Sequence, residues 1–372
     1  MKPRVIIVYN DCRYVYKFKK NLIKAIQSEG YGVSVIAPYD RYANKLRLLG
    51  VDFLSLDIGG RELNPFHHAM ILWRLRRRLK AAQPAAILLF GAKPNILGGV
   101  AAIGLNGKTI HNITGLGTTF LRSGSQKAFM LLLYRCAMRF SDTIFFQNFE
   151  DKNLFVENRA VIASKVKVIP GSGVDLERYA GFELRKPRVN RVTFIGRLLL
   201  DKGIVEFLDA ANSLSLKYPD VIFTVLGGID SSVNVGVSEY ELDSKTQASN
   251  IEYLGEVEDV RPIIANSICV VLPSYREGLP RVLLESLAMK VPVIATDVPG
   301  CRQVVEHGVS GYLCQAKNVG SLQEAMITML ELPSRARDSM GDNGQQHVKR
   351  VFDEKLVIDQ YLKAIGSGVV RH

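Results

Sequence analysis

The sequence predicts an α/β protein of two domains, each built on a doubly wound parallel sheet. The chain has 372 residues, 47% of them hydrophobic, which is enough to fill two cores of ordinary size. Short apolar runs alternate with helical patterns along both halves, as in sheets whose two faces are covered by helices. A stretch rich in Gly, Pro and charged residues at 171–190 interrupts both patterns and predicts a linker.

The first half supplies alternating strands and helices. The expected strands cover residues 4–10, 32–38, 51–57, 85–90, 108–115, 142–148 and 165–170. The expected helices cover residues 18–30, 66–82 and 126–140. The same rhythm returns in the second half, with a helix at 202–217 and with strands at 191–197, 221–228, 250–255, 267–273 and 292–297.

These elements place the domains at residues 1–178 and 187–354, with a C-terminal helix at about 355–367 that packs back on the first domain. Two similar domains joined by one linker predict a deep cleft between them. Ligands of such sheets bind beyond the carboxyl ends of the strands, where the helices begin.

Composition narrows the class of protein. The longest apolar runs, at 85–91 and 128–138, are too short to span a bilayer, and the opening residues predict no secretion leader. Five cysteines without a C-x-x-C spacing argue against a disulfide framework or a structural zinc and favour the cytoplasm. Charge is uneven: residues 1–186 hold 29 Lys and Arg against 13 Asp and Glu, whereas 187–372 hold 19 against 23. A basic first half suggests nucleic acid, an anionic membrane or a phosphorylated ligand.

Two cations follow the first strand of the second half. In FIGRLLLDKG (194–203), Gly196 allows the backbone to approach a ligand, and Gly203 permits the turn into the next helix. Arg197 and Lys202 suit a diphosphate, as a fork and a point charge. The same spacing fits two surface cations beside a turn equally well.

The stretch REGLPRVLLES (276–286) holds two glutamates eight residues apart. Its helix start, near Pro280, is an anion site by geometry, because the first N–H groups lack helical partners. Eight helical residues rise about 12 Å, comparable to the span from a sugar to a ribose across a diphosphate. Glu277 is then expected at the sugar and Glu285 at the ribose. The alternatives are a helix-capping role for Glu277 and an exposed position for Glu285.

The pairing of GRLLLDKG with EGLPRVLLE resembles the retaining family-four glycosyltransferases, which have the GT-B fold. The resemblance covers essentially the whole chain and is strongest at 165–315. The sequence is similar above all to bacterial enzymes that extend undecaprenyl-diphosphate-linked sugars, among them N-acetylgalactosaminyltransferases of N-glycan assembly. It implies transfer of a sugar, a GalNAc or GlcNAc, from a UDP-sugar donor to a polyprenyl-diphosphate-linked saccharide, with retention of configuration.

The resemblance also implies roles for residues of the second domain. Arg197 and Lys202 would hold the donor phosphates, and Glu277 would orient the transferred sugar; these three are the catalytic candidates. Val257, in the loop after the 250–255 strand, would lie where the family holds the base. The donor-binding candidates are Gly196, Ser274, Gly278, Leu279, Glu285 and Val257.

Candidates for the acceptor side lie in the first domain. The loop at 10–18 lacks the paired glycines that many relatives place beside the donor phosphates, so Asp11 or Arg13 can meet the acceptor; an ordinary polar loop is the alternative. His111 and Thr114, at the end of another strand, can line the reacting centre. His111 fits a buried strand histidine equally well.

We expect no metal and no cofactor. The chain has no Asp-x-Asp, the usual anchor of a metal–diphosphate site, and the UDP-sugar is a substrate. The sequence therefore predicts metal-independent transfer.

The helix at 67–84 is strongly basic. Leu72, Leu75 and Leu79 share one face, and the rest is crowded by Arg74, Arg76, Arg77, Arg78 and Lys80. Such a helix can lie on anionic lipid or can be an ordinary solvated helix. The charge asymmetry favours peripheral contact with the cytoplasmic face of the inner membrane. Helix 126–140 fits either a core or a lipid-facing position.

Other classes of protein remain as alternatives. A UDP-sugar epimerase can share this fold but needs no acceptor. A nucleic-acid-binding protein fits the charge, yet the chain has no recognition motif for nucleic acid and the two glutamates stay unexplained. A dehydrogenase is disfavoured because no G-x-G-x-x-G follows the first strand.

Overall fold

A computed structural model describes residues 2–58, 64–116, 124–180, 182, 190–229 and 236–366. The chain divides into two compact units. Unit 1 comprises Met1–Ser172 and Lys355–His372, and unit 2 comprises Gly173–Glu354. The linker predicted at 171–190 lies partly outside the described residues, and the division itself falls at the start of that stretch.

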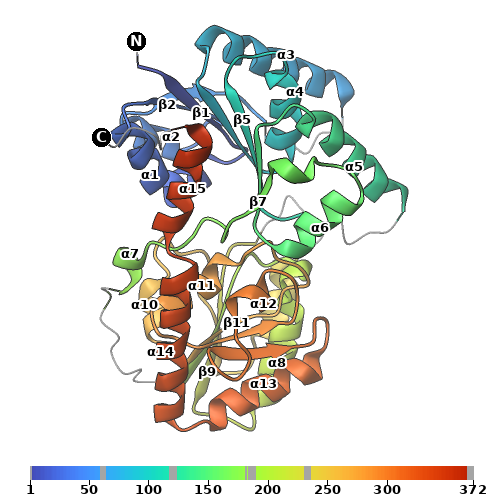
Figure 1. The fold of residues 1–372 in the computed structure, drawn as a ribbon. Helices are drawn as coiled ribbons and strands as arrows, with labels where there is room; N and C mark the ends of the chain where they lie inside the picture. Colours follow the sequence, from blue (N-terminus) through green and yellow to red (C-terminus); the bar gives the residue numbers. More distant parts are fainter. Residues whose placement is uncertain are drawn as a thin grey trace. The chain divides into compact units, whose positions relative to one another are not determined.

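Unit 1 contains a parallel sheet of seven described strands in the order β3-β2-β1-β4-β5-β6-β7 (Figure 1). The strands are β1 Arg4–Val8, β2 Gly32–Ala37, β3 Asp52–Ser55, β4 Ala86–Phe90, β5 Lys108–Ile113, β6 Thr143–Phe146 and β7 Val166–Val168. The order reverses between β1 and β4, as in doubly wound sheets.

Both faces of this sheet are buried. Along β1, Val5 and Ile7 join one hydrophobic cluster, whereas Ile6 and Val8 join another. This alternation explains why the strand reads as a continuous apolar run. The surrounding helices are α1 Cys12–Ser28, α2 Tyr42–Arg47, α3 Pro65–Ala82, η1 Pro94–Gly98, α4 Gly99–Ala102, α5 Ser125–Met138, α6 Phe149–Glu157 and η3 Ala163–Lys165.

The C-terminal helix α15, Glu354–Ile365, completes the core of unit 1. Tyr361 is buried, and its hydroxyl donates to Asn112 Oδ1 at 2.5 Å. Its ring lies 6.0 Å from that of Phe90 and 5.2 Å from that of Phe145. A segment from the end of the sequence therefore packs on the sheet formed by the beginning.

Unit 2 contains a parallel sheet of six described strands in the order β10-β9-β8-β11-β12-β13. The strands are β8 Asn190–Ile195, β9 Val221–Leu226, β10 Ile251–Tyr253, β11 Cys269–Leu272, β12 Val293–Thr296 and β13 Gly311–Cys314. The parallel α/β architecture predicted for both halves is confirmed. The sequence did not predict β13, a four-residue strand whose two central residues are only half-buried.

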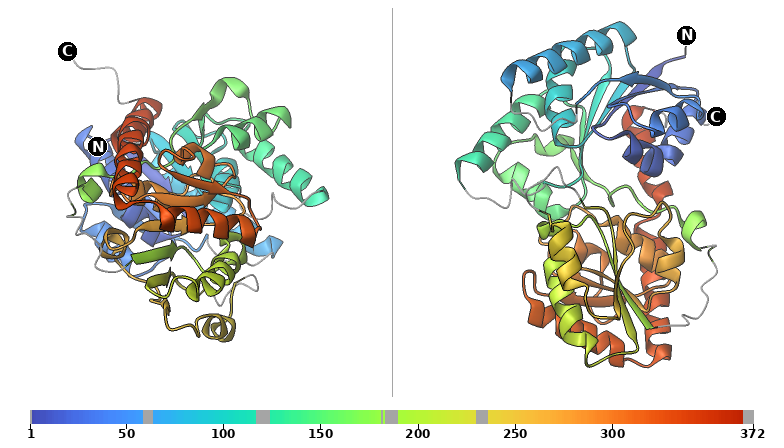
Figure 2. Two further views of the ribbon diagram at one scale, coloured as in Figure 1. Left: turned by 90° about the horizontal axis from the view of Figure 1, so that it is seen from below. Right: turned by 180° about the vertical axis from the view of Figure 1, so that it is seen from behind.

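Helices cover both faces of the second sheet as well (Figure 2). Along β11, Val271 joins one hydrophobic cluster, and Val270 and Leu272 join the other. The helices of unit 2 are α7 Leu176–Ala180, η4 Leu200–Lys202, α8 Ile204–Ser215, α9 Glu239–Lys245, α10 Arg261–Ala265, α11 Arg281–Ala288, α12 Cys301–Val304, α13 Val319–Glu331 and α14 Ser334–Val351. Across the described ranges, none of the helices is both long and apolar enough to cross a membrane.

Candidate functional site

The two sequence motifs of unit 2 meet at one ion pair. Lys202 ends η4, after strand β8, and Glu277 lies in the loop between β11 and α11. Lys202 Nζ donates to Glu277 Oε1 at 2.5 Å, and Ser274 Oγ donates to the same oxygen at 2.8 Å. The side chains of Lys202 and Glu277 are 19% and 13% exposed. Because β8 and β11 are parallel neighbours, their carboxyl ends bring these groups to one edge of the sheet.

Gly203 makes this meeting sterically feasible. Its φ is +73°, and a Cβ there would overlap the carbonyl of Pro273, with the carbonyl carbon only 2.7 Å away. A backbone hydrogen bond also joins the two loops, since Tyr275 N–H donates to Asp201 O at 2.8 Å. The loop that carries Lys202 is thus fixed directly against the end of β11.

A third loop supports Glu277 from the other side. Gly300 has φ +84°, and a Cβ there would lie 2.5 Å from Gly278 O and 2.8 Å from Glu277 O. The Thr296 hydroxyl donates to Ser274 O. Sequence reasoning missed this support, although the turn after the 292–297 strand, with Pro299 and Gly300, was a signal for it.

Helix α11 starts at Arg281, with Pro280 at the N-cap and, within the described chain, no side chain capping its first turn. Uncapped N–H groups and the helix dipole favour an anion at this position. Glu277 therefore lies outside the helix and does not cap it. The estimate of about 12 Å between the two glutamates assumed a helix from Glu277 to Glu285. This assumption is wrong, because the helix begins only at Arg281.

Glu285 is buried, with 8% of its surface exposed, so the alternative of an exposed glutamate is wrong. Arg281, one helical turn earlier, lies 3.2 Å away and also donates to Gly173 O at 3.0 Å. Burial raises the pKa of the Tyr179 hydroxyl, and the nearby Glu285 carboxylate raises it further. Arg281 and Tyr179 provide the partners that a buried carboxylate needs, and sequence reasoning missed both.

The remaining donor-side candidates lie on the loops that follow β8, β10 and β11. Arg197 is exposed on the loop after β8. Gly196 is half-buried, and a Cβ there would make only ordinary contact, at 3.4 Å from the Phe194 ring. Leu279 is buried beside Glu277, and Val257 is half-buried on the loop after β10.

Two family models match the chain. The model described as glycosyl transferases group 1 matches residues 178–347, and the model described as glycosyl transferase 4-like matches residues 6–148. Together they account for most of the sequence, with the ion pair inside the first match. The chain belongs to the group 1 glycosyltransferases. The resemblance to family-four glycosyltransferases with the GT-B fold is thereby confirmed.

Individual relatives agree with this assignment. An N,N'-diacetylbacillosaminyl-diphospho-undecaprenol α-1,3-N-acetylgalactosaminyltransferase of Campylobacter jejuni is 26% identical, over 94% of this chain and 94% of its own. A UDP-Gal:α-D-GlcNAc-diphosphoundecaprenol α-1,3-galactosyltransferase of Escherichia coli is 26% identical, over 77% and 78%.

Solved structures share the fold of this glycosyltransferase. A glycosyltransferase of Rickettsia africae superimposes with a TM-score of 0.80 at 16% identity over the whole of both chains. Anabaena HepE, crystallised with UDP and glucose, gives a TM-score of 0.80 at 17% identity, over 98% of this chain and all of its own. At these identities the likeness concerns the fold alone.

The first unit of the glycosyltransferase holds the acceptor-side candidates. Asp11 is the N-cap of α1 and accepts from Tyr14 N–H at 3.2 Å. The Arg13 guanidinium lies 5.6 Å from the centre of the Tyr14 ring. Thr114 follows β5 and is half-buried. Asp11 and Thr114 lie at the carboxyl ends of β1 and β5, the edge where ligands of such sheets bind.

His111 is fully buried within β5, which corrects its prediction as a residue that lines the reacting centre. Its Nδ1 lies 3.0 Å from Asn95 Oδ1, and burial lowers its pKa to about 3. Gly99 covers the ring so closely that a Cβ there would lie 2.7 Å from His111 Cε1. These contacts leave the ring no surface to offer an acceptor.

The basic helix α3 uses part of its charge internally. Leu75 and Leu79, predicted to share one face with Leu72, are buried, and Leu72 is half-buried against the same cluster. Arg76 donates to two backbone carbonyls of the α4 region at 2.8–2.9 Å, and Arg78 donates to a carbonyl at the end of β3 at 2.5 Å. These hydrogen bonds tie the Arg76 and Arg78 side chains to neighbouring backbone of unit 1.

The outer face of α3 combines aromatic and basic side chains. Phe66, Met70 and Trp73 are exposed at helical spacing. The Arg77 guanidinium lies 5.7 Å from the Trp73 ring, and Arg74 is exposed beside it. Helix α5 was predicted to have either a core or a lipid-facing position. Its Tyr134 is buried, but Phe129 and Leu132 are exposed.

Proposed function

We propose that this glycosyltransferase moves an N-acetylhexosamine, GalNAc or GlcNAc, from a UDP-sugar to a polyprenyl-diphosphate-linked saccharide, with retention of configuration. The reaction belongs to the assembly of bacterial surface glycans or glycoprotein glycans. One observation carries the proposal: Lys202, Ser274 and Glu277 converge beside the uncapped start of α11, with Glu285 buried one turn along that helix.

The donor diphosphate binds at the start of α11. The first N–H groups of the helix and the cations of Lys202 and Arg197 face its negative charge. As the bond to the sugar breaks, negative charge accumulates on the diphosphate. Lys202, once its ammonium has turned from Glu277 to the phosphate, stabilises that charge more than it stabilises the bound donor.

The two glutamates hold the two ends of the donor. Glu277 accepts hydrogen bonds from hydroxyls of the transferred sugar once Lys202 turns to the phosphate. Glu285, already held by Arg281, accepts from the ribose hydroxyls. Backbone groups around Val257 hold the base. Neither glutamate is a nucleophile in this scheme; the departing phosphate takes the proton of the acceptor hydroxyl, which attacks from the same face.

Unit 2 binds the donor, and unit 1, including α15, binds the acceptor. Support for a lipid-linked acceptor comes from the names and lengths of two relatives, which act on diphospho-undecaprenol-linked sugars and align along most of the chain. Asp11, Arg13 and Thr114 are the side chains of unit 1 proposed to meet it.

The enzyme meets such an acceptor at the cytoplasmic face of the inner membrane, as a peripheral protein. The outer face of α3 supports this, because Phe66, Met70 and Trp73 suit the interfacial region of a bilayer and Arg74 and Arg77 suit anionic headgroups. The proposal involves no nucleic acid.

Transfer is proposed to need no metal, since Lys202, Arg197 and the helix start provide the positive field at the diphosphate. Turnover after exhaustive treatment with EDTA measures this directly. Unchanged turnover supports the proposal, and loss of turnover that Mn²⁺ restores overturns it.

The decisive experiment incubates the protein with a panel of UDP-sugars and synthetic polyprenyl-diphosphate-linked glycans and identifies the products by mass and NMR. A glycan extended by one α-linked N-acetylhexosamine is expected. Conversion of a UDP-sugar without acceptor indicates an epimerase instead. Absence of both turnover and donor binding contradicts the proposal.

A further inference from the structure

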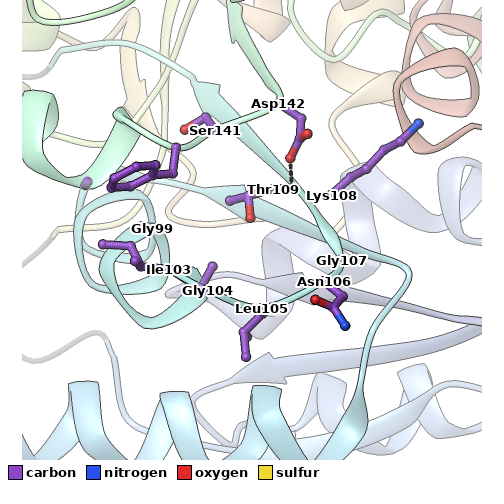
Figure 3. A pocket seen from close by; sticks show the side chains of 13 residues that line it. Gly99, Ile103, Gly104, Leu105, Asn106, Gly107, Lys108, Thr109, Ser141 and Asp142 are labelled. Carbon is purple, nitrogen blue, oxygen red and sulfur yellow. Dashed lines mark hydrogen bonds between the residues drawn. The ribbon is translucent and has the colours of Figure 1, made fainter.

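Unit 1 contains a pocket of about 420 Å³ at the amino ends of β5 and β6 (Figure 3). Its volume lies in the range of small-molecule sites, roughly 300–1,000 Å³. The lining comes from α4, the end of α5, the 103–107 loop, the first two residues of β5 and the segment at 140–142 that leads into β6. Thr114 follows the other end of β5, roughly 20 Å away by the rise of a strand. The pocket is therefore separate from the proposed acceptor contacts.

Ser141 supplies the first sign of a ligand. Its side chain lines the pocket and is only 1% exposed. Among the described residues, its hydroxyl has no hydrogen-bond partner. A buried hydroxyl without a partner is costly, and such groups in folded proteins usually have one. A polar group of a ligand in the pocket would provide it.

Further polar groups lie on the same strand ends. Asp142 Oδ2 accepts from the backbone N–H of Thr109 at 2.8 Å, which fixes the carboxylate at the wall of the pocket (Figure 3). Its second oxygen makes no hydrogen bond within the described parts of the chain, so it remains able to accept from a ligand. The Thr109 hydroxyl and the exposed Asn106 amide complete the polar lining.

The rest of the lining is apolar and includes an aromatic ring. Phe140 lines the pocket while 61% of its surface is exposed. Leu105, Ile103 and Ala137 contribute aliphatic surface. An exposed ring beside hydroxyl, carboxylate and amide groups matches a ligand with an apolar face and a rim of hydroxyls.

The charges at the pocket disfavour an anion. The Asp142 carboxylate is negative, and α5 ends here, so its dipole presents negative charge. Lys108 is the one cation among the described residues that line the pocket. Its ammonium lies beside Gly366, just after α15, 3.1 Å from where a Cβ of that residue would lie. A phosphate or a nucleotide is therefore poorly matched, whereas a neutral polyhydroxylated ligand is well matched.

We propose that this pocket is a saccharide-binding site, distinct from the site of sugar transfer. A pyranose ring lies against Phe140, and its hydroxyls exchange hydrogen bonds with Ser141, Thr109 and Asp142. The inference depends on the chemistry of the pocket and not on the proposed donor or acceptor. The saccharide can belong to a free sugar or to the glycan of a lipid-linked substrate.

Binding is tested by NMR titration of the whole protein with methyl glycosides of GlcNAc, GalNAc, glucose and galactose. A second arm uses a short-chain polyprenyl-diphosphate trisaccharide. Phe140→Ala removes the aromatic surface, and Ser141→Ala removes the orphaned hydroxyl. Phe129→Ala, which removes a ring of equal exposure (60%) on α5, is the matched control. Glu277→Gln alters only the donor side.

At least one saccharide is expected to bind. Phe140→Ala weakens this binding about tenfold, as loss of a stacked ring does, and Ser141→Ala weakens it roughly three- to tenfold, as loss of one hydrogen bond does. Phe129→Ala and Glu277→Gln leave it unchanged. Ser141→Ala also keeps or raises the unfolding temperature, because it removes an unsatisfied group; a merely structural serine would not combine this with weaker binding.

Three results overturn the proposal: no binding of any saccharide in either arm, binding that Phe140→Ala and Ser141→Ala leave unchanged, or binding lost in Glu277→Gln, which would assign it to the donor side. Binding in the trisaccharide arm alone assigns the pocket to the lipid-linked glycan. Because no donor is present in these titrations, failure of the saccharide site is distinguishable from failure of the proposed transfer reaction.

Discussion

Gly203 lies at a position where two features disfavour a side chain: its positive φ and the nearby carbonyl of Pro273. The φ of +73° belongs to the left-handed region, and a Cβ would overlap the carbonyl of Pro273. Pro273 is the first residue after β11, in the loop that leads to Glu277, and the residue before Gly203 is Lys202. Gly203→Ala is therefore expected to destabilise unit 2 and to separate Lys202 from Glu277.

The magnitude follows from a comparison with Gly308 in the same unit. Gly308 has φ +75°, but a Cβ there would meet no atom within 4 Å. Gly308→Ala should cost only the left-handed conformation, about 1–2 kcal/mol. Gly203→Ala should cost this plus the strain of overpacking against a carbonyl, about 1–3 kcal/mol more.

Hydrogen exchange of peptides from β11 and α11 measures the stability of unit 2 by itself, and calorimetry measures the affinity for UDP. Gly203→Ala should lose protection beyond that of Gly308→Ala and should bind UDP about tenfold more weakly, the effect of losing a charge-assisted contact. Equal loss of protection in the two variants, or unchanged UDP affinity in Gly203→Ala, would refute the reasoning.

Three further predictions concern other parts of the molecule. In steady-state kinetics, Glu277→Gln should lower turnover about a hundredfold, whereas Glu285→Gln should mainly raise the donor KM, about tenfold; the reverse pattern would exchange their roles. His111, with its pKa lowered by burial to about 3, takes up no proton in the folded state as pH falls below its ordinary 6.5, whereas the unfolded chain does. The free energy of unfolding, measured in urea, should therefore fall by about 2 kcal/mol between pH 6.5 and 5. If His111→Asn leaves this pH dependence unchanged, His111 is not its cause. The Arg74→Gln and Arg77→Gln variants should each weaken binding to anionic liposomes, measured by co-sedimentation, by about 1 kcal/mol. Binding that neither these changes nor salt affects would contradict contact through α3.

The architecture was predictable because its signals are local. A strand such as β4, Ala86–Phe90, is buried on both faces and so reads as an uninterrupted apolar run. β13 was not predictable in this way, since its four residues include two that are only half-buried. His111 was ambiguous for a related reason: the alternation of a strand assigns a side chain to a face of the sheet, but only the tertiary structure brings Gly99 over that face.

The partners of the two glutamates were only partly predictable from the sequence. Arg281 lies one helical turn before Glu285 on α11, a spacing at which opposite charges meet on a helix. Tyr179 comes from a separate segment that only the fold brings to Glu285. The pairing of Lys202 with Glu277 has a further consequence, because each residue was expected to face the donor. Each satisfies the charge of the other within the protein, so a diphosphate must compete with Glu277 for Lys202, and Glu277 is released toward the sugar as that competition succeeds. A single ion-pair exchange would thus couple binding of the phosphate to positioning of the sugar. Neither sequence motif alone predicts this coupling, because Lys202 and Glu277 belong to different motifs.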